Sequence, residues 1–172
     1  QVKGVVVFTD PLMARIRGGV LEHGCARLMR EAQAGERMDR EGQVHDGFFI
    51  AHDGIRDRVD LKGLTGGNSV IVYGQTELTR DLYDARDRLG GIVIHHADDV
   101  TPHDFGTPRP YLTCRRNDET LRVDCDFIIG CDGFHGVSRK SIPKDSIREF
   151  ERVYPFGWLG VLSRTKPVSP EL

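Results

Sequence analysis

The chain has 172 residues, with 24 lysines and arginines against 26 aspartates and glutamates, so its formal net charge is −2. This length fits one ordinary domain, or one domain and part of another. The balanced charge argues against a nucleic-acid partner, and no apolar run approaches the roughly 20 residues that span a bilayer, so we expect no membrane partner either.

The first predicted elements are a strand and a helix. Residues 5–8 are apolar and mostly β-branched, as in a strand buried on both faces, and Asp10-Pro11 ends the run. From Val20 onward the spacing predicts a helix that Gly35 closes. Its expected apolar face consists of Leu21, Cys25, Leu28, Met29 and Ala32.

A hairpin and a β-α-β unit are predicted next. Residues 44–61 fit two strands joined at Asp53-Gly54, a dipeptide that favours tight hairpin turns. Residues 70–73 then fit a strand that passes through Gly74 into a helix, followed by a strand at 92–94. We expect parallel strands and a right-handed crossover, with a helix face formed by Leu78, Leu82, Ala85 and Leu89.

The last predicted elements follow a loop that contains three prolines, Pro102, Pro108 and Pro110. Residues 111–116 and 121–129 fit strands on either side of the turn-like Asn117-Asp118. The second strand alternates apolar and charged residues, and its end, residues 127–129, is expected to enter a core. Together the elements predict an α/β (α+β) fold.

The four cysteines, Cys25, Cys114, Cys125 and Cys131, form no CxxC pair and show no zinc-like spacing with histidine. We interpret them as reduced, mostly buried thiols of a cytoplasmic protein. The adjacent His95-His96 would point to opposite faces of a strand, so we expect no metal site.

The first candidate site is the segment Arg15-Ile16-Arg17-Gly18-Gly19 ahead of the first helix. Alternate arginines of an extended segment share a face, and glycines let a ligand approach the backbone. Arginine forks match phosphate oxygens, so the pattern indicates a phosphate or pyrophosphate site. The alternative is two solvated arginines in a Gly-Gly turn.

Two further candidates follow predicted strands. Gln75 stands at a strand-to-helix joint, where open α/β sheets bind ligands, although helix-start glutamines are common. In the segment 130–139, Asp132 could accept from a ribose or an amide and Gly133 allows close backbone approach. His135 and Arg139 could meet phosphate charge. The alternative there is an Asp-Gly turn with an incidental basic pair.

Four segments, read together, carry a family resemblance. They are residues 15–24 (RIRGGVLEHG), 72–82 (VYGQTELTRDL), 126–139 (DFIIGCDGFHGVSR) and 150–160 (FERVYPFGWLG). In this order they closely resemble the 4-hydroxybenzoate 3-monooxygenase family of FAD-dependent aromatic hydroxylases. The resemblance runs from about Gly4 to Leu172.

The resemblance implies cofactor-binding roles for particular residues. The segment around the FAD pyrophosphate and flavin is matched by Arg15, Ile16, Arg17, Gly18, Gly19 and Val20, and an FAD-contacting glutamine by Gln75. Asp132, Gly133 and Phe134 match the motif that serves both FAD and NADPH. His135 and Arg139 match residues implicated in NADPH binding, and Arg17 is a further candidate for that role.

The resemblance also implies the reaction: hydroxylation of 4-hydroxybenzoate to 3,4-dihydroxybenzoate with NADPH and dioxygen, through a flavin C4a-hydroperoxide. The expected fold is a partial FAD-binding Rossmann-like domain with part of the substrate-domain sheet. Residues 1–69 would be a partial FAD-binding domain with a hairpin insertion, 70–150 the remaining FAD and NADPH elements, and 151–172 the start of the substrate domain.

By this resemblance the sequence is an internal fragment, inactive alone, whose catalytic residues are expected beyond Leu172. Two alternatives remain open: a truncated, non-catalytic remnant that at most binds a nucleotide, and a related flavin hydroxylase acting on another benzoate. The sequence also leaves open whether subunits pair as a homodimer.

Overall fold

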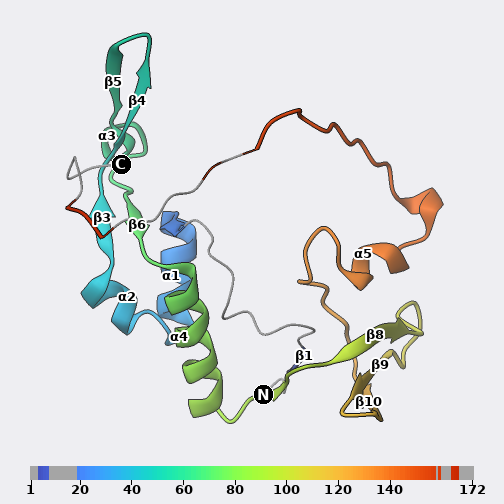
Figure 1. The fold of residues 1–172 in the computed structure, drawn as a ribbon. Coiled ribbons are helices and arrows are strands. Elements are labelled where there is room, and N and C mark those ends of the chain that lie inside the picture. The colour runs from blue at the N-terminus through green and yellow to red at the C-terminus, as the bar shows by residue number, and fades with distance from the viewer. Residues whose placement is uncertain (1–3, 8–18, 158, 160–163, 167–172) are drawn as a thin grey trace. The chain divides into compact units, whose positions relative to one another are not determined.

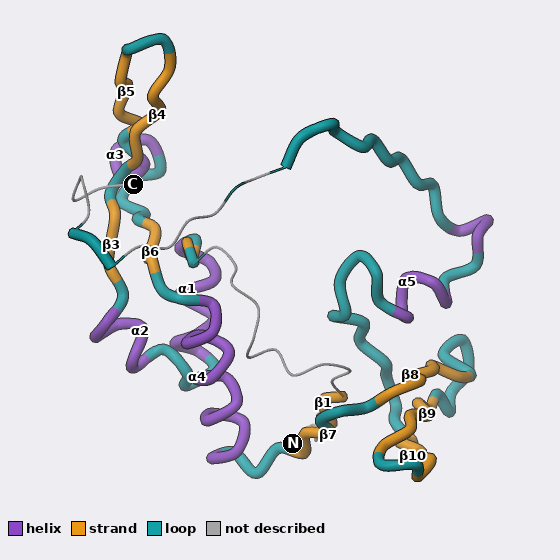
Figure 2. Tube along the Cα trace, in the orientation of Figure 1, coloured by secondary structure: helices purple, strands orange, loops and turns teal. Residues whose placement is uncertain are grey.

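The computed structural model describes residues 4–7, 19–157, 159 and 164–166 of the chain (Figure 1). The chain divides into two compact units, one built mainly on residues 19–92 and the other mainly on residues 93–157. Helices and strands occur in both, as Figure 2 shows, so the expected mixture of α and β structure is confirmed.

The sheet of the first unit has β6 (Val70–Val72) at its centre, between β2 (Val20–Leu21) and β3 (Gln43–His45). Both neighbours run antiparallel to β6, and Val72 faces Val20 on one side and Gln43 on the other. The β-branched residues of β6 suit this central, partly buried position.

The expected parallel β-α-β unit is wrong. Strand β7 (Ile92–Ile94) lies in a different sheet from β6, where it pairs with β1 (Val5–Val7). Strand β1 is half-buried and not buried on both faces. Pairing with antiparallel neighbours from distant segments therefore replaces the local crossover that the sequence suggested for β6.

Four helices belong to the first unit: α1 (His23–Glu31), α2 (Glu36–Glu41), α3 (Leu61–Leu64) and α4 (Gln75–Arg88). Helix α1 ends before Gly35, which instead precedes α2, a helix that the sequence pattern did not reveal. A Cβ atom at Gly35 would lie 2.9 Å from Cγ of Arg30, so glycine permits the close approach of these two segments.

The predicted apolar faces of α1 and α4 are partly wrong. In α1 the buried residues are Ala26 and Met29, whereas Cys25 and Leu28 are exposed. In α4 the buried residues are Asp81 and Ala85, whereas Leu82 and Leu89 are exposed. The buried residues of both helices belong to, or hydrogen-bond with, the cluster around Ile71 and Tyr73, and spacing within one helix could not show this.

The hairpin prediction is confirmed. Strands β4 (Phe48–His52) and β5 (Ile55–Val59) pair antiparallel, and the turn falls at Asp53-Gly54. Both turn residues have positive φ, 47° at Asp53 and 79° at Gly54, as a type I′ turn requires. Strand β3, which the sequence merged with this hairpin, is a separate element.

The second unit contains the meander β8 (Asp98–His103), β9 (Tyr111–Arg116) and β10 (Glu119–Asp124), in the order β10-β9-β8. The turn at Asn117-Asp118 is confirmed, with positive φ at both residues. Helix α5 (Val137–Ser141) and a short 3-10 helix (Lys144–Ser146) follow.

Two expectations about the second unit are wrong. Strand β8 forms where a proline-containing loop was expected, and it includes Pro102. An edge strand tolerates proline because one of its sides forms no ladder, and β8 is an edge strand. Residues after β10 do not enter a core, since Phe127 is 84% and Ile129 83% exposed.

The largest group of buried side chains lies in the first unit, where α1, α2, β6 and α4 meet. Its members are Ala26, Met29, Ala34, Met38, Ile71, Tyr73 and Ala85. Of the four cysteines, all free, Cys114 is buried but Cys25 and Cys131 are exposed, so the expectation of mostly buried thiols is wrong for these two. Among the described helices, none combines the length and apolar composition that crossing a bilayer requires.

Candidate functional site

The first group of candidate residues lies where β6 passes into α4. Gly74 is the N-cap residue of α4 and has extended backbone angles, φ −56° and ψ 132°, so the helix begins directly at Gln75. Glu77 in the first turn and Arg86 and Arg88 in the last turn suit the helix dipole. The predicted strand-to-helix joint with Gln75 at the helix start is therefore present.

Three buried side-chain atoms lack a hydrogen-bond partner among the described residues, Nδ1 of His45, Oε1 of Gln75 and Nε of Arg86, and only Gln75 is a predicted site residue. Its side-chain oxygen Oε1 is buried, and no donor among the described residues forms a hydrogen bond to it. A buried acceptor without a partner is costly, and such groups in native proteins require an explanation. A bound molecule that offers an N–H or O–H group would satisfy this oxygen.

Gly19 and Val20 lie beside this joint. Val20 pairs with Val72 in the sheet, and the backbone N–H of Tyr73 donates a 2.6 Å hydrogen bond to the carbonyl of Gly19. A Cβ atom at Gly19 would lie only 2.6 Å from the carbonyl oxygen of Tyr73, so this position requires glycine. The predicted contacts Gly19, Val20 and Gln75 are thus brought to one place.

The other members of this predicted segment, Arg15, Ile16, Arg17 and Gly18, lie outside the described residues. The anion site assigned to Arg15 and Arg17 therefore stays a prediction. Because Gly19 continues that segment toward Tyr73 and Gly74, the described part is compatible with it.

A polar network behind the joint was missed by the sequence analysis. The hydroxyl of Tyr73 donates to Oδ2 of Asp81 at 2.6 Å, and Arg37 from α2 donates to Oδ1 of Asp81 through Nε at 2.8 Å. Arg37 also pairs with the Glu77 carboxylate and donates to the Glu77 carbonyl at 3.0 Å. The available signal was an aspartate on the inward face of a predicted helix.

Burial and hydrogen bonding tune the groups of this network. Burial raises the pKa of Tyr73, and its hydrogen bond to Asp81 raises that pKa further. The hydrogen bond to Asp81 likewise raises the pKa of Arg37. Tyr73 therefore stays a neutral donor and Arg37 a cation at neutral pH.

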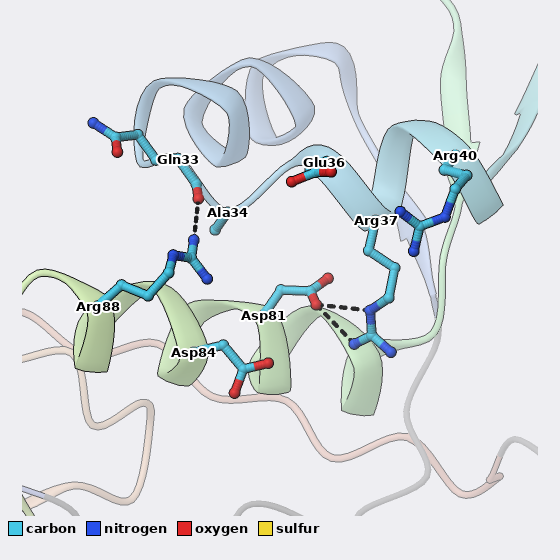
Figure 3. A pocket seen from close by; sticks show the side chains of 8 residues that line it. All are labelled: Gln33, Ala34, Glu36, Arg37, Arg40, Asp81, Asp84 and Arg88. Carbon is cyan, nitrogen blue, oxygen red and sulfur yellow. Dashed lines mark hydrogen bonds and ion pairs between the residues drawn. The ribbon is translucent and has the colours of Figure 1, made fainter.

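A cavity of about 210 Å³ lies between the α1–α2 connection, α2 and α4 (Figure 3). Each of its three arginines is already engaged: Arg37 with Asp81, Arg88 with the carbonyl of Gln33 at 2.7 Å, and Arg40 with Glu41 at 2.9 Å. Three carboxylates, Glu36, Asp81 and Asp84, line the same cavity and offset the charge of the arginines, so the cavity offers no strong cationic field for an anion. Its lining residues are Gln33, Ala34, Glu36, Arg37, Arg40, Asp81, Asp84 and Arg88.

The second group of candidates, residues 132–139, lies in the second unit. The carboxylate of Asp132 accepts a 2.9 Å hydrogen bond from the backbone N–H of Ser138 in α5, and this bond is the main cause that holds its pKa below the ordinary value. A Cβ atom at Gly136 would collide with that carboxylate, and Gly133 has a φ of 72°. Asp132 thus folds the loop back onto the start of α5.

Phe134 joins the two basic residues of the motif. The His135 ring meets the Phe134 ring edge-on at 5.0 Å, and the Arg139 guanidinium lies 4.7 Å from the Phe134 ring centre. Arg139 also pairs with Glu149 at 2.9 Å. Contacts thus hold both basic residues in place, their role in phosphate binding stays a prediction, and an incoming phosphate would have to compete with Glu149 for Arg139.

Comparison with known proteins places this chain among flavoproteins. The family model described as "FAD binding domain" matches residues 8–171. The chain is 45% identical over 163 residues to a p-hydroxybenzoate hydroxylase of Acinetobacter baylyi, an alignment that covers 95% of this chain and 40% of that protein. The chain thus spans well under half the length of this relative.

Solved structures with similar folds include a monooxygenase and a flavin-dependent halogenase. The p-nitrophenol 4-monooxygenase PnpA from Pseudomonas putida DLL-E4 matches with a TM-score of 0.59 at 10% identity, over 73% of this chain and 33% of that one. The flavin-dependent halogenase CmlS matches with a TM-score of 0.60 at 22% identity, over 80% of this chain and 26% of that one. At these identities the likeness establishes the fold alone.

Proposed function

We propose that this chain, which belongs to the FAD binding domain family, is part of an FAD-dependent monooxygenase that uses NADPH and dioxygen to hydroxylate 4-hydroxybenzoate. The observation that carries the proposal is the buried Oε1 of Gln75, which lies at the start of α4 beside Gly19 and accepts no hydrogen bond from any described residue. The relationship to a p-hydroxybenzoate hydroxylase supports the choice of substrate.

The residues present at the first candidate site fit FAD. The amide of Gln75 offers an acceptor that needs a donor, and flavin and ribityl groups carry N–H and O–H donors. Gly19 and Val20 extend from the Arg15–Arg17 segment, whose guanidinium groups we assign to the pyrophosphate. When bound, FAD supplies the redox chemistry that takes up hydride from NADPH and reacts with dioxygen.

The second candidate site suits the dinucleotide phosphates. We assign His135 and Arg139 to NADPH, and Asp132 with Gly133 to the turn that both cofactors approach. In this proposal Arg139 releases Glu149 and binds a phosphate when NADPH binds, because Nε and Nη2, which both donate to Oε1 of Glu149, can donate to phosphate oxygens instead. Phe134 keeps the guanidinium oriented during that exchange.

The test uses the natural gene product that carries this sequence. The FAD dissociation constant is measured by flavin fluorescence for the unchanged protein and for Gln75→Ala, with Gln43→Ala, at an exposed position of strand β3, as the matched control. We expect about a tenfold weaker FAD complex for Gln75→Ala, equivalent to roughly 1.4 kcal/mol, and no change for the control. Equal FAD affinity in all three proteins would refute the Gln75 assignment.

The reaction is tested by NADPH oxidation and product analysis. We expect 4-hydroxybenzoate to stimulate NADPH oxidation and to yield 3,4-dihydroxybenzoate. Stimulation by a different benzoate alone would identify a related hydroxylase, and FAD binding without any hydroxylated product would identify a non-catalytic binding protein. A cytoplasmic location, which suits the free cysteines, and pairing as a homodimer complete the proposal; cell fractionation and light scattering test them.

A further inference from the structure

The network behind the joint is centred on a buried carboxylate. Asp81 lies in the second turn of α4 and is 8% exposed, although the surrounding buried residues are apolar. Carboxylates are almost never buried unless they are paired, because desolvation of the charge is costly. Asp81 meets this requirement through two donors from two other segments of the first unit.

Each carboxylate oxygen of Asp81 has its own donor. Oδ2 accepts from the Tyr73 hydroxyl at 2.6 Å, and Oδ1 accepts from Nε of Arg37 at 2.8 Å and lies 2.7 Å from Nη2 in the ion pair. Figure 3 shows the Arg37 side chain reaching from α2 to Asp81 on α4. Asp81 therefore links helix α4 both to Tyr73, the residue after β6, and to Arg37 of α2.

The same donors also hold the first turn of α4. Nη2 of Arg37 donates to the backbone carbonyl of Glu77 at 3.0 Å, two residues after Gln75. Tyr73 stands two residues before Gln75, and its backbone N–H donates to the carbonyl of Gly19. Gln75 thus lies between Tyr73 and Glu77 in the sequence. Tyr73 donates to Asp81 directly, and Glu77 is linked to Asp81 through Arg37.

We propose that Asp81 is a positioning residue for the FAD site, acting through Tyr73 and Arg37 to fix the first turn of α4 and with it the amide of Gln75. The inference rests on the proposed function, in which Gln75 contacts FAD. A ligand contact of this kind must be held within about 0.5 Å, and the residues behind it provide that rigidity.

The test compares variants of the natural gene product loaded with FAD. Asp81→Asn removes the charge that holds Arg37, and Tyr73→Phe removes only the hydroxyl donor. Asp84→Asn is the matched control, because Asp84 lies one turn further along α4 and is exposed. We expect the FAD dissociation constant to rise about tenfold in the first two variants and to change less than about twofold in the control.

A double-mutant cycle separates positioning from general destabilisation. If Asp81 acts through Gln75, Asp81→Asn and Tyr73→Phe will not weaken FAD binding further in a Gln75→Ala background, since residues that share one contact are not additive. Additive losses, or an unchanged FAD affinity in folded Asp81→Asn and Tyr73→Phe, overturn the proposal. Circular dichroism identifies the folded variants, and Tyr73→Phe decides the matter should Asp81→Asn not fold.

The same measurements tell apart the failure of this inference and that of the proposed function. If FAD binding weakens in Gln75→Ala but not in Asp81→Asn or Tyr73→Phe, the FAD assignment of Gln75 is supported. The positioning role of Asp81 is then refuted. If Gln75→Ala leaves the FAD dissociation constant unchanged, both the FAD assignment of Gln75 and the positioning role of Asp81 are refuted.

Discussion

The hydroxyl of Tyr73 and the carboxylate of Asp81 form a hydrogen bond of 2.6 Å between two buried side chains, eight residues apart in the sequence. Tyr73 follows the central strand of its sheet, and Asp81 lies on the inward face of α4. This one bond therefore joins the sheet to the helix that starts with Gln75.

We predict that Tyr73→Phe lowers the free energy of unfolding by about 1–3 kcal/mol, because one oxygen of the buried carboxylate then loses its donor. Urea denaturation followed by circular dichroism measures this change. Tyr154→Phe is the control, since Tyr154 is 56% exposed, and it should change stability by less than about 0.5 kcal/mol. Equal losses in the two variants would show that the bond to Asp81 adds nothing.

Two glycine substitutions should act in opposite directions. Gly54→Ala should destabilise the β4–β5 hairpin by about 1 kcal/mol, because Gly54 has a φ of 79° that alanine adopts only with strain. Gly24→Ala should stabilise α1 by about 0.5 kcal/mol, since a Cβ there meets nothing within 4 Å and alanine favours helix. Thermal unfolding of both variants tests the pair, and a stabilising Gly54→Ala would contradict the turn geometry.

The bond between Asp132 and the Ser138 amide makes the start of α5 sensitive to acid. Hydrogen bonding holds the pKa of Asp132 below its ordinary value of 3.8, so the folded state binds this proton less readily than the unfolded state does. The stabilisation is therefore complete above the unfolded pKa, and is lost as the pH falls through the lower folded pKa.

The amide resonance of Ser138, followed by NMR between pH 2 and 6 (roughly the range over which carboxylates titrate), should shift with a midpoint below 3.8. In Asp132→Asn this titration should vanish. A midpoint at or above the ordinary value would mean that Ser138 does not stabilise the charged carboxylate.

Local sequence signals predicted the local elements well. The turns at Asp53-Gly54 and Asn117-Asp118 and the helix start after Gly74 were all found, because each depends on the backbone preferences of two or three residues. Predictions that depended on distant partners fared worse. The partners of β6 come from residues 20–21 and 43–45, and no periodicity within β6 indicates them.

The candidate site shows the same division. Gln75 and the loop from Asp132 to Arg139 could be singled out from sequence because glycines mark their joints. The roles of Arg37 and Asp81 could not, since a charged pair between α2 and α4 resembles ordinary surface charge until the packing of the helices is known. The ion pair between Arg139 and Glu149, ten residues further along the chain, likewise has no local sequence signal.

The central place of β6 also governs when its sheet can assemble during synthesis. Strands β2 and β3 are synthesised before β6. Because each pairs with β6 and not with the other, neither can join the sheet until β6 has been synthesised. The delay for β2 is about 50 residues, or roughly 3–10 s at ordinary rates of translation. The strand that completes the sheet is followed at once by Gln75, so this corner of the molecule and its proposed cofactor contact are completed together.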